Sequence, residues 1–279
     1  MTTTYFNRLT AEHQKLPYAK YMDFPYPDPA IPVNVAAKIA APMDPAKALR
    51  LERVNDLLEP GYNEDDMGYC ILPDGAGYIG ETIPFTGSSR EMFEWWFAWH
   101  GLEELRYRIW DPEAHVASSV SAGHIGKRLN ATLPWRSRII GTAHFTTHVA
   151  RDGSLDPGVM HFVSPEAFGL DLSRPGGKEV SIVAALHGKA GLPFPSMSSI
   201  RVLRDTSDGF VMRIYFWQGQ IPLKGNCIRL GNEVSAADME YLAAHCGQEY
   251  NRLASLLPQI YAENHHVQNR VEEFRTVNV

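Results

Sequence analysis

The order of the elements expected along the chain predicts an α+β fold, in which an antiparallel sheet curls around one long C-terminal helix. Beyond about residue 137, short stretches alternate apolar and polar side chains between turn clusters such as Arg151-Asp152-Gly153, which is typical of strands joined by hairpins. The expected strands span residues 138–149, 158–163, 179–186, 198–204 and 209–217. A helix at 235–263 closes the chain, and we expect it to enclose a cavity with the sheet in a helix-grip arrangement.

The N-terminal part of the chain has a different texture. Residues 1–42 contain six prolines, which exclude a regular helix or a central strand. They leave either a mobile arm or a segment that wraps over a neighbour. A helix is expected at 44–58, because Asp44 and Pro45 suit the N-cap and the first helical position.

Two further segments connect this part to the strands. Glycine and proline around short apolar runs predict a hairpin at 67–85. Helical periodicity returns at 89–110 and is broken near Gly101. We therefore divide the chain into an N-terminal arm with a small helical and hairpin region, residues 1–88, and a main domain, residues 89–279.

Composition and charge exclude several classes of protein. The 279 residues are 44% hydrophobic and 21% charged, as in ordinary globular proteins. A net charge of −6 with scattered lysines and arginines argues against a nucleic-acid binder. The apolar runs are too short for the roughly 18 residues of a membrane span, and no signal peptide is evident. Three widely spaced cysteines predict neither a disulfide framework nor a cysteine-rich zinc site, so we expect a cytoplasmic protein.

Two polar residues interrupt the apolar face of the expected C-terminal helix. Its core-facing stripe runs through positions 242, 245, 249, 253 and 256, which hold three leucines together with His245 and Glu249. Because the two are four residues apart, their side chains share one face of the helix. Burial without partners would be costly. The pair is therefore either a plain hydrogen-bonded pair or part of a site for a divalent metal such as zinc, which accepts histidine nitrogen and carboxylate oxygen.

Other histidines are candidates for the remaining ligands. Asp111 followed by Pro112 is a helix-start signal, which places His115 at the end of a first helical turn. His144 and His148 lie in an expected strand, and a period of two puts both on one face. That face also carries threonines, and it fits either the wall of a wet cavity or an exposed surface.

Two motifs carry a resemblance to a known family. They are His245-Cys-Gly-Gln-Glu249 and Tyr107-Arg-Ile-Trp-Asp-Pro-Glu-Ala-His115, with an aromatic run at 93–100 upstream. Over roughly residues 60–260 the chain resembles the diacetylphloroglucinol hydrolases, whose other well-known member is phloretin hydrolase. The resemblance implies a Bet v 1-like helix-grip domain preceded by a smaller region that assists dimerisation, and hence a homodimer. It also implies a zinc hydrolase that cleaves the C–C bond between an acyl group and a phenolic ring and releases a carboxylic acid.

The resemblance implies the zinc ligands residue by residue. His115, His245 and Glu249 match three of them. The family's fourth ligand, a glutamate on a strand, has no counterpart here. The chain offers His148 in its place, with His144 as the alternative because it shares the same face.

The resemblance further implies which groups handle the substrate. Tyr107 and Tyr215 match two phenol-binding tyrosines, and each offers a donor on a flat apolar body that could hold a phenolic oxygen. For Tyr215 the alternative is plain packing within a strand. A hydroxide formed at zinc would attack the ketone. His124 or a zinc-bound water is the candidate proton donor to the ring carbon.

Two other functions fit the same pattern. The first is a helix-grip protein that binds a small hydrophobic ligand without metal chemistry, and metal analysis separates it from a hydrolase. The second is a metal-dependent polyketide lyase or cyclase, which would release no carboxylic acid. In all three cases the expected partner is a small molecule, and for the hydrolase it is an aromatic acyl ketone.

Overall fold

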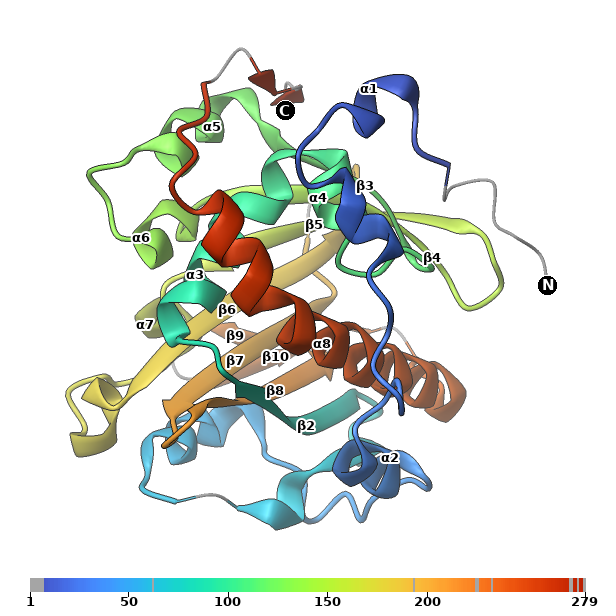
Figure 1. The fold of residues 1–279 in the computed structure, drawn as a ribbon. Helices are drawn as coiled ribbons and strands as arrows, with labels where there is room; N and C mark the ends of the chain where they lie inside the picture. Colours follow the sequence, from blue (N-terminus) through green and yellow to red (C-terminus); the bar gives the residue numbers. More distant parts are fainter. Residues whose placement is uncertain are drawn as a thin grey trace.

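One large sheet organises the molecule (Figure 1). The computed structural model describes residues 8–61, 63–192, 194–223, 226–231, 233–270, 273–274 and 276–277. The nine strands follow the order β1-β2-β8-β7-β6-β5-β4-β3-β11, and neighbours pair antiparallel except for β11, which is parallel to β3. Their bounds are β1 Gly68–Ile71, β2 Gly77–Thr86, β3 His115–Ser121, β4 Ala143–Val149, β5 Leu155–Val163, β6 Val180–Lys189, β7 Met197–Asp205, β8 Gly209–Gln218 and β11 Thr276–Val277.

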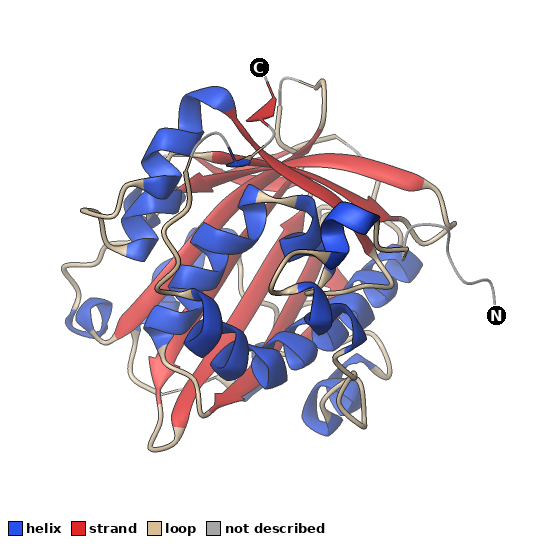
Figure 2. Cartoon of the chain, turned by 45° about the horizontal axis from the view of Figure 1, so that its top comes forward, coloured by secondary structure: helices blue, strands red, loops and turns tan. Residues whose placement is uncertain are grey.

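A long helix, α8 (Ala236–Asn264), lies across one face of the sheet, beside α3 (Arg90–Trp99). Figure 2 shows helices gathered in front of the strands. A second, two-stranded sheet pairs β9 (Gln220–Leu223) with β10 (Asn226–Arg229). The shorter helices are α1 Ala11–Gln14, η2 Ala19–Asp23, α2 Val33–Ile39, η3 Leu51–Leu58, η4 Glu64–Asp66, η5 His100–Leu102, α4 Glu104–Arg108, α5 Ala122–Leu129, α6 Trp135–Ile139, α7 Pro165–Phe168 and η6 Pro175–Lys178. This is the predicted α+β helix-grip arrangement, a large antiparallel sheet with a long C-terminal helix across one face.

The sheet separates two hydrophobic cores. Alternate residues of β8 show the division, since Ile214 and Phe216 face the core under α8 whereas Tyr215 and Trp217 face a second core. The second core is closed by η3 and by Phe168 of α7. A side chain on β8 therefore belongs to one core or the other according to its position in the strand.

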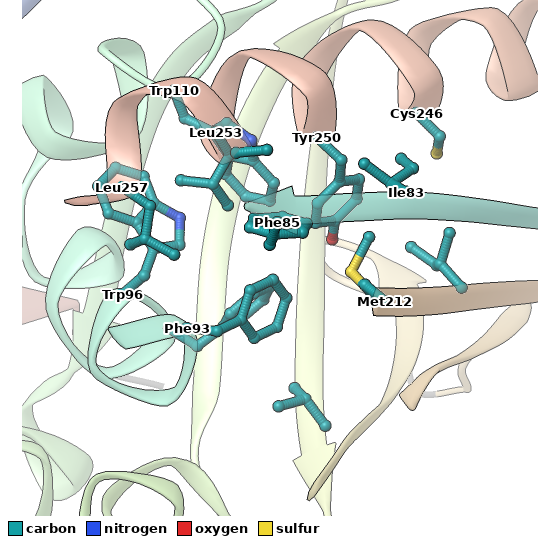
Figure 3. Packing of buried hydrophobic residues seen from close by; sticks show 14 of the residues in the cluster. Ile83, Phe85, Phe93, Trp96, Trp110, Met212, Cys246, Tyr250, Leu253 and Leu257 are labelled. Carbon is teal, nitrogen blue, oxygen red and sulfur yellow. The ribbon is translucent and has the colours of Figure 1, made fainter. Parts of the chain in front are cut away.

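The C-terminal helix confirms its prediction almost to the residue. Ser235 is the N-cap and accepts a hydrogen bond from the Asp238 amide. The buried stripe is displaced from the expected one, however, and is centred on Cys246, Tyr250 and Leu253, which pack on β2 and β8 (Figure 3). Glu249 consequently lies at the edge of the buried face and turns away from its centre.

Around the first histidine motif, the predicted first turn is confirmed but the helix is not. The amide of His115 donates to the Asp111 carbonyl and closes a single turn, after which β3 starts at His115 instead of a helix continuing. The alternation at 138–149 likewise begins too early, because residues up to Ile139 form α6. A short run of alternating apolar and polar side chains is compatible with a helix as well as with a strand when a neighbouring element covers the apolar side.

The N-terminal region also differs from expectation. The expected helix at 44–58 is a turn at Asp44 followed by the 3-10 helix η3. A boundary at residue 88 does not separate two sheets, because β2 pairs with β8 along its whole length. The proline-rich arm wraps over α8 of its own chain, where Arg252 donates to the carbonyls of Phe24 and Tyr21. Among the helices that the structure describes, none has the length and apolar character to cross a membrane.

Candidate metal centre

Three ligand-type side chains converge where α8 meets the start of β3. They are His115, His245 and Glu249, and one nitrogen or oxygen atom of each lies within 4.8 Å of the others. The Nε2 atoms of His115 and His245 are 3.2 and 3.8 Å from the same carboxylate oxygen, Oε2 of Glu249. His115 and Glu249 are buried, and His245 is partly so. The sequence motifs that predicted these residues lie more than 120 positions apart, and the fold brings them together.

Both imidazoles are oriented through their second nitrogen. Nδ1 of His115 donates to the backbone carbonyl of Tyr107 at 3.1 Å, since a carbonyl can only accept. Nδ1 of His245 lies 3.3 Å from Oδ2 of Asp111. Each ring therefore directs Nε2 toward Glu249. This is the arrangement of metal-binding histidines in proteins, whose other nitrogen donates to a carbonyl or carboxylate.

Charge interactions within the site stabilise the ionised form of Asp111 and the protonated form of His245. Burial alone would raise the pKa of Asp111, but its hydrogen bond to His245 and the charges of both histidines lower it well below its usual range. Burial lowers the pKa of His245, yet the carboxylates of Glu249 and Asp111 outweigh burial and raise it to about 9. Without a metal, a proton on His245 thus neutralises part of this acidic cluster.

The donor set fits zinc. Two imidazole nitrogens and one carboxylate oxygen are ligands that zinc accepts, and a catalytic zinc keeps a further position open. Bonds of about 2.0–2.1 Å in a tetrahedron place neighbouring ligand atoms about 3.4 Å apart. The observed separations of 3.2 and 3.8 Å from Glu249 Oε2 are close to this value. The ligand atoms of all three residues lie within 4.8 Å of one another, so the two histidines would draw closer to hold the ion.

His148 lies beside this triad without joining it. It pairs directly with His115 across β3 and β4, so both side chains lie on one face of the sheet. Its Nε2 is 3.7 Å from Oδ2 of Asp156, and the side chain is 39% exposed. Burial, then the charges of His115 and His245, lower the pKa of His148 to about 4. Its imidazole is therefore neutral, as a metal ligand must be.

His144, the alternative to His148, lies in the core. Its ring packs against His100 and Phe162, with ring centroids 5.1 Å apart in both cases. The ring also lies directly against Gly101, where even a Cβ atom would overlap it. Sharing a strand face with His148 does not bring His144 to the triad, because the two are four residues apart along β4.

Tyr107 is part of the site. Its ring stacks on the imidazole of His115 with centroids 3.9 Å apart and planes 7° apart. Burial, followed by the charges of Glu249 and Asp111, raises its pKa well above the usual value, and a hydrogen bond with Thr146 opposes this only in part. The hydroxyl therefore keeps its proton and can serve as a donor.

The structure does not bring two other predicted residues to the triad. Tyr215 faces the second core, on the far side of the sheet from α8, where its hydroxyl donates to Oδ2 of Asp66 at 3.2 Å. His124 lies on α5, and its Nδ1 accepts the amide hydrogen of Ala143. Ala143 begins β4, whereas His148 lies near the other end of that strand.

The sequence analysis missed two residues that support the site. Asp111 was interpreted only as a helix-start signal, although a carboxylate four residues before His115 could have indicated a partner for a metal ligand. The second is Tyr26 of the N-terminal arm, whose hydroxyl donates to Oδ1 of Asp111. Nothing local in the sequence predicts a contact between residues 85 positions apart.

A pocket of about 880 Å³ opens next to the triad. His148 and Asp156 line it from the sheet, and Tyr241 and Leu242 line it from α8. The ring of Tyr241 is parallel to that of His245, with centroids 6.5 Å apart. The pocket thus reaches the neighbours of two triad members and is large enough for a small aromatic ligand.

Comparisons with known proteins identify the family of the chain. The family model described as the DAPG hydrolase PhiG domain matches residues 49–262. A curated 2,4-diacetylphloroglucinol hydrolase of Pseudomonas protegens is 30% identical, over 92% of this chain and 88% of its own length. The phloretin hydrolase of Eubacterium ramulus is 29% identical, over 90% of this chain and 92% of its own. The chain therefore belongs to the 2,4-diacetylphloroglucinol hydrolase family.

Proposed function

We propose that this hydrolase uses zinc to cleave the C–C bond between an acyl group and a phenolic, phloroglucinol-type ring, with release of a carboxylic acid. One observation carries the proposal. Two histidines, each oriented through Nδ1, direct Nε2 to one carboxylate oxygen, in a chain whose relatives are named as hydrolases of diacetylphloroglucinol and phloretin. Such a set has the geometry of a metal site with an open position.

Different residues of the chain have different roles in the proposed reaction. His115, His245 and Glu249 would hold zinc, which supplies a nucleophilic water at neutral pH and polarises a bound carbonyl. Asp111 and the Tyr107 carbonyl fix the orientation of the two imidazoles. The protonated hydroxyl of Tyr107 can donate to a phenolic or ketone oxygen beside the triad, and its ring excludes water from His115.

His148 is our proposed fourth ligand, which would leave a fifth position for water. Its place opposite His115 and its neutral imidazole support this, and rotation of the ring away from Asp156 would bring a nitrogen toward the triad. We expect His148→Ala to weaken zinc binding about 10- to 100-fold. The matched variant His144→Ala, on the same strand face, should keep its zinc. Plasma emission spectrometry measures the zinc content of both variants after dialysis against increasing concentrations of chelator. Loss of zinc in His144→Ala alone would make His144 the fourth ligand.

The function is tested by combining zinc measurement with a screen of acylated phenols for acid release. The expected result is about one zinc per chain and stoichiometric formation of acid and deacylated phenol. Purified protein with less than about a tenth of an equivalent of zinc that still binds the phenol would instead identify a binding protein. Turnover without acid would identify a lyase or cyclase. The homodimer, which the family resemblance implies, and the cytoplasmic location, which the cysteine pattern suggests, are part of this proposal.

A further inference from the structure

A buried arginine lies under α8 with no acidic partner. Arg201 of β7 is 2% exposed and faces the core that α8 covers. Within the residues that the structure describes, no carboxylate lies at ion-pair distance from its guanidinium. Its immediate surroundings are the faces of Phe97, Phe216 and Tyr250, with centroids 5.4–5.8 Å from the guanidinium carbon.

The groups close enough to feel this charge do not neutralise it. Burial lowers the pKa of His100 and of His187, so neither imidazole is charged at neutral pH. The Cys246 thiol and the Tyr250 phenol are uncharged in their ordinary forms at neutral pH. Glu81 on β2, which also interacts with Cys246, is fully buried, and burial followed by the charge of Glu249 raises its pKa well above the usual value. An isolated buried cation is costly unless a counter-charge joins it.

Hydrogen bonds hold the guanidinium in one orientation. Nε donates to the Tyr250 hydroxyl at 2.7 Å, and Nη1 donates to the Ser199 hydroxyl at 2.8 Å. Ser199 in turn lies 2.6 Å from Nε2 of His187, which accepts its proton because the neutral ring is the favoured form. These bonds use two of the five N–H donors of an arginine. Among the described residues, Nη2 has no hydrogen-bond partner, and the Tyr250 hydroxyl, which accepts from Arg201, still has its own proton to donate.

These donors lie next to the candidate metal centre. The ring of Trp110 packs against both Tyr250 and the candidate ligand His115, with centroids 5.2 and 5.1 Å apart, so one side chain separates these donors from the triad. Acylated phenols have acidic hydroxyls, and their ionised oxygens are the anions such a site would meet. We propose that Arg201, together with the Tyr250 hydroxyl, binds an ionised phenolic oxygen of the substrate ring. This contact would select acylated phenols over ketones that have no phenolic hydroxyl. The inference rests on the proposed function for its choice of ligand.

Binding without turnover provides the test. The probes are phloroglucinol, which has no acyl group to lose, and its trimethyl ether, which cannot ionise. By calorimetry we expect the intact zinc-loaded protein to bind phloroglucinol more tightly as pH rises through the first ionisation of the phenol. The ether should bind more weakly and without this pH dependence.

Variants assign the effect to the guanidinium. Arg201→Gln should weaken phloroglucinol binding about 30-fold or more and flatten its pH dependence, while binding of the ether stays unchanged. Tyr250→Phe should lose about fivefold. Arg204→Gln is the matched control, because Arg204 lies on the same strand but donates to the carbonyls of Leu57 and Glu59. Should Arg201→Gln not fold, Arg201→Lys, which keeps the charge but not the fork of donors, should show an intermediate loss with the pH dependence retained.

The outcomes separate this inference from the proposed function. Wild-type affinity and pH dependence in both Arg201→Gln and Tyr250→Phe, or in Arg201→Lys and Tyr250→Phe where Gln does not fold, would overturn it. Release of acid by a protein whose KM is unaffected by the Arg201 substitution would also overturn it while leaving the hydrolase intact. Phenol binding that depends on Arg201, in a protein that releases no acid from any acylphenol, would support the inference and reject the hydrolase.

Discussion

The two faces of the sheet each bury a polar cluster, and the clusters differ in how their atoms are satisfied. On the far face, Arg213 and Tyr215 both donate to the carboxylate of Asp66, at 2.6 and 3.2 Å. There the carboxylate finds its donors within the protein. Under α8, the Nε2 atoms of two imidazoles and one carboxylate oxygen converge on one point, where the charge of Glu249 meets only a proton in the metal-free protein. A buried cluster that satisfies itself stabilises the fold, whereas one whose acceptors converge calls for a cation from outside.

Removing a triad ligand should have the largest effect. In Glu249→Gln the carboxylate charge is lost while the shape is kept, so we expect zinc binding to fail and acid release to fall about a thousandfold. The protein should remain folded, as circular dichroism would show. Retention of full activity with bound zinc would remove Glu249 from the site and with it the contrast between the two faces.

The pH dependence of stability should reveal the proton that replaces the metal. Because the pKa of His245 is raised to about 9, its stabilising charge is fully present below about pH 6.5 and is lost as pH rises through 9. In the metal-free protein this amounts to about 3 kcal/mol between pH 6.5 and 9.5. Urea unfolding in chelator measures it, with His245→Asn as the reference that should lack this component.

In the presence of zinc, the contribution of His245 to stability should rise with pH instead of falling. Ligands must be deprotonated to bind a metal, so zinc affinity rises as His245 loses its proton. The stabilisation by added zinc should therefore be larger at pH 9 than at pH 6.5. A loaded protein that loses stability with pH as steeply as the metal-free one would mean that His245 stays protonated and is no ligand.

Asp111 tests whether the support of the imidazole matters. Asp111→Asn keeps a hydrogen-bond acceptor near His245 but removes the charge, and we expect zinc affinity to fall about 10- to 100-fold. Asp111 is fully buried, so its effect on unfolding has to be measured beside zinc affinity. The control is Tyr26→Phe, which removes only the hydroxyl bound to the other carboxylate oxygen and should have a smaller effect.

The parts of the site that depend on short-range spacing could be predicted from the sequence, whereas those that depend on contacts between distant segments could not. Helical spacing placed His245 and Glu249 on one face correctly, because four residues fix their relation in any helix. The spacing did not predict which face of α8 is buried. That face is rotated from the expected one, so that Cys246 and Tyr250 occupy its centre. The turn from Asp111 to His115 was predicted, but not the strand that follows it, because β3 forms at His115 by pairing with β4. Tyr26 and Arg201 depend entirely on tertiary contacts.

The same substitution on each face gives the smallest but sharpest comparison. Tyr107→Phe removes a hydroxyl beside the triad, and we expect acid release to fall about tenfold with little change in zinc content. Tyr215→Phe removes a hydroxyl that Asp66 already uses, so unfolding should cost about 1 kcal/mol less while activity per folded molecule is unchanged. Steady-state kinetics and urea unfolding of both variants measure the pair. A fall in kcat for Tyr215→Phe would place that tyrosine back at the substrate, as the family resemblance implies. It would also show that the sheet transmits changes from one face to the other.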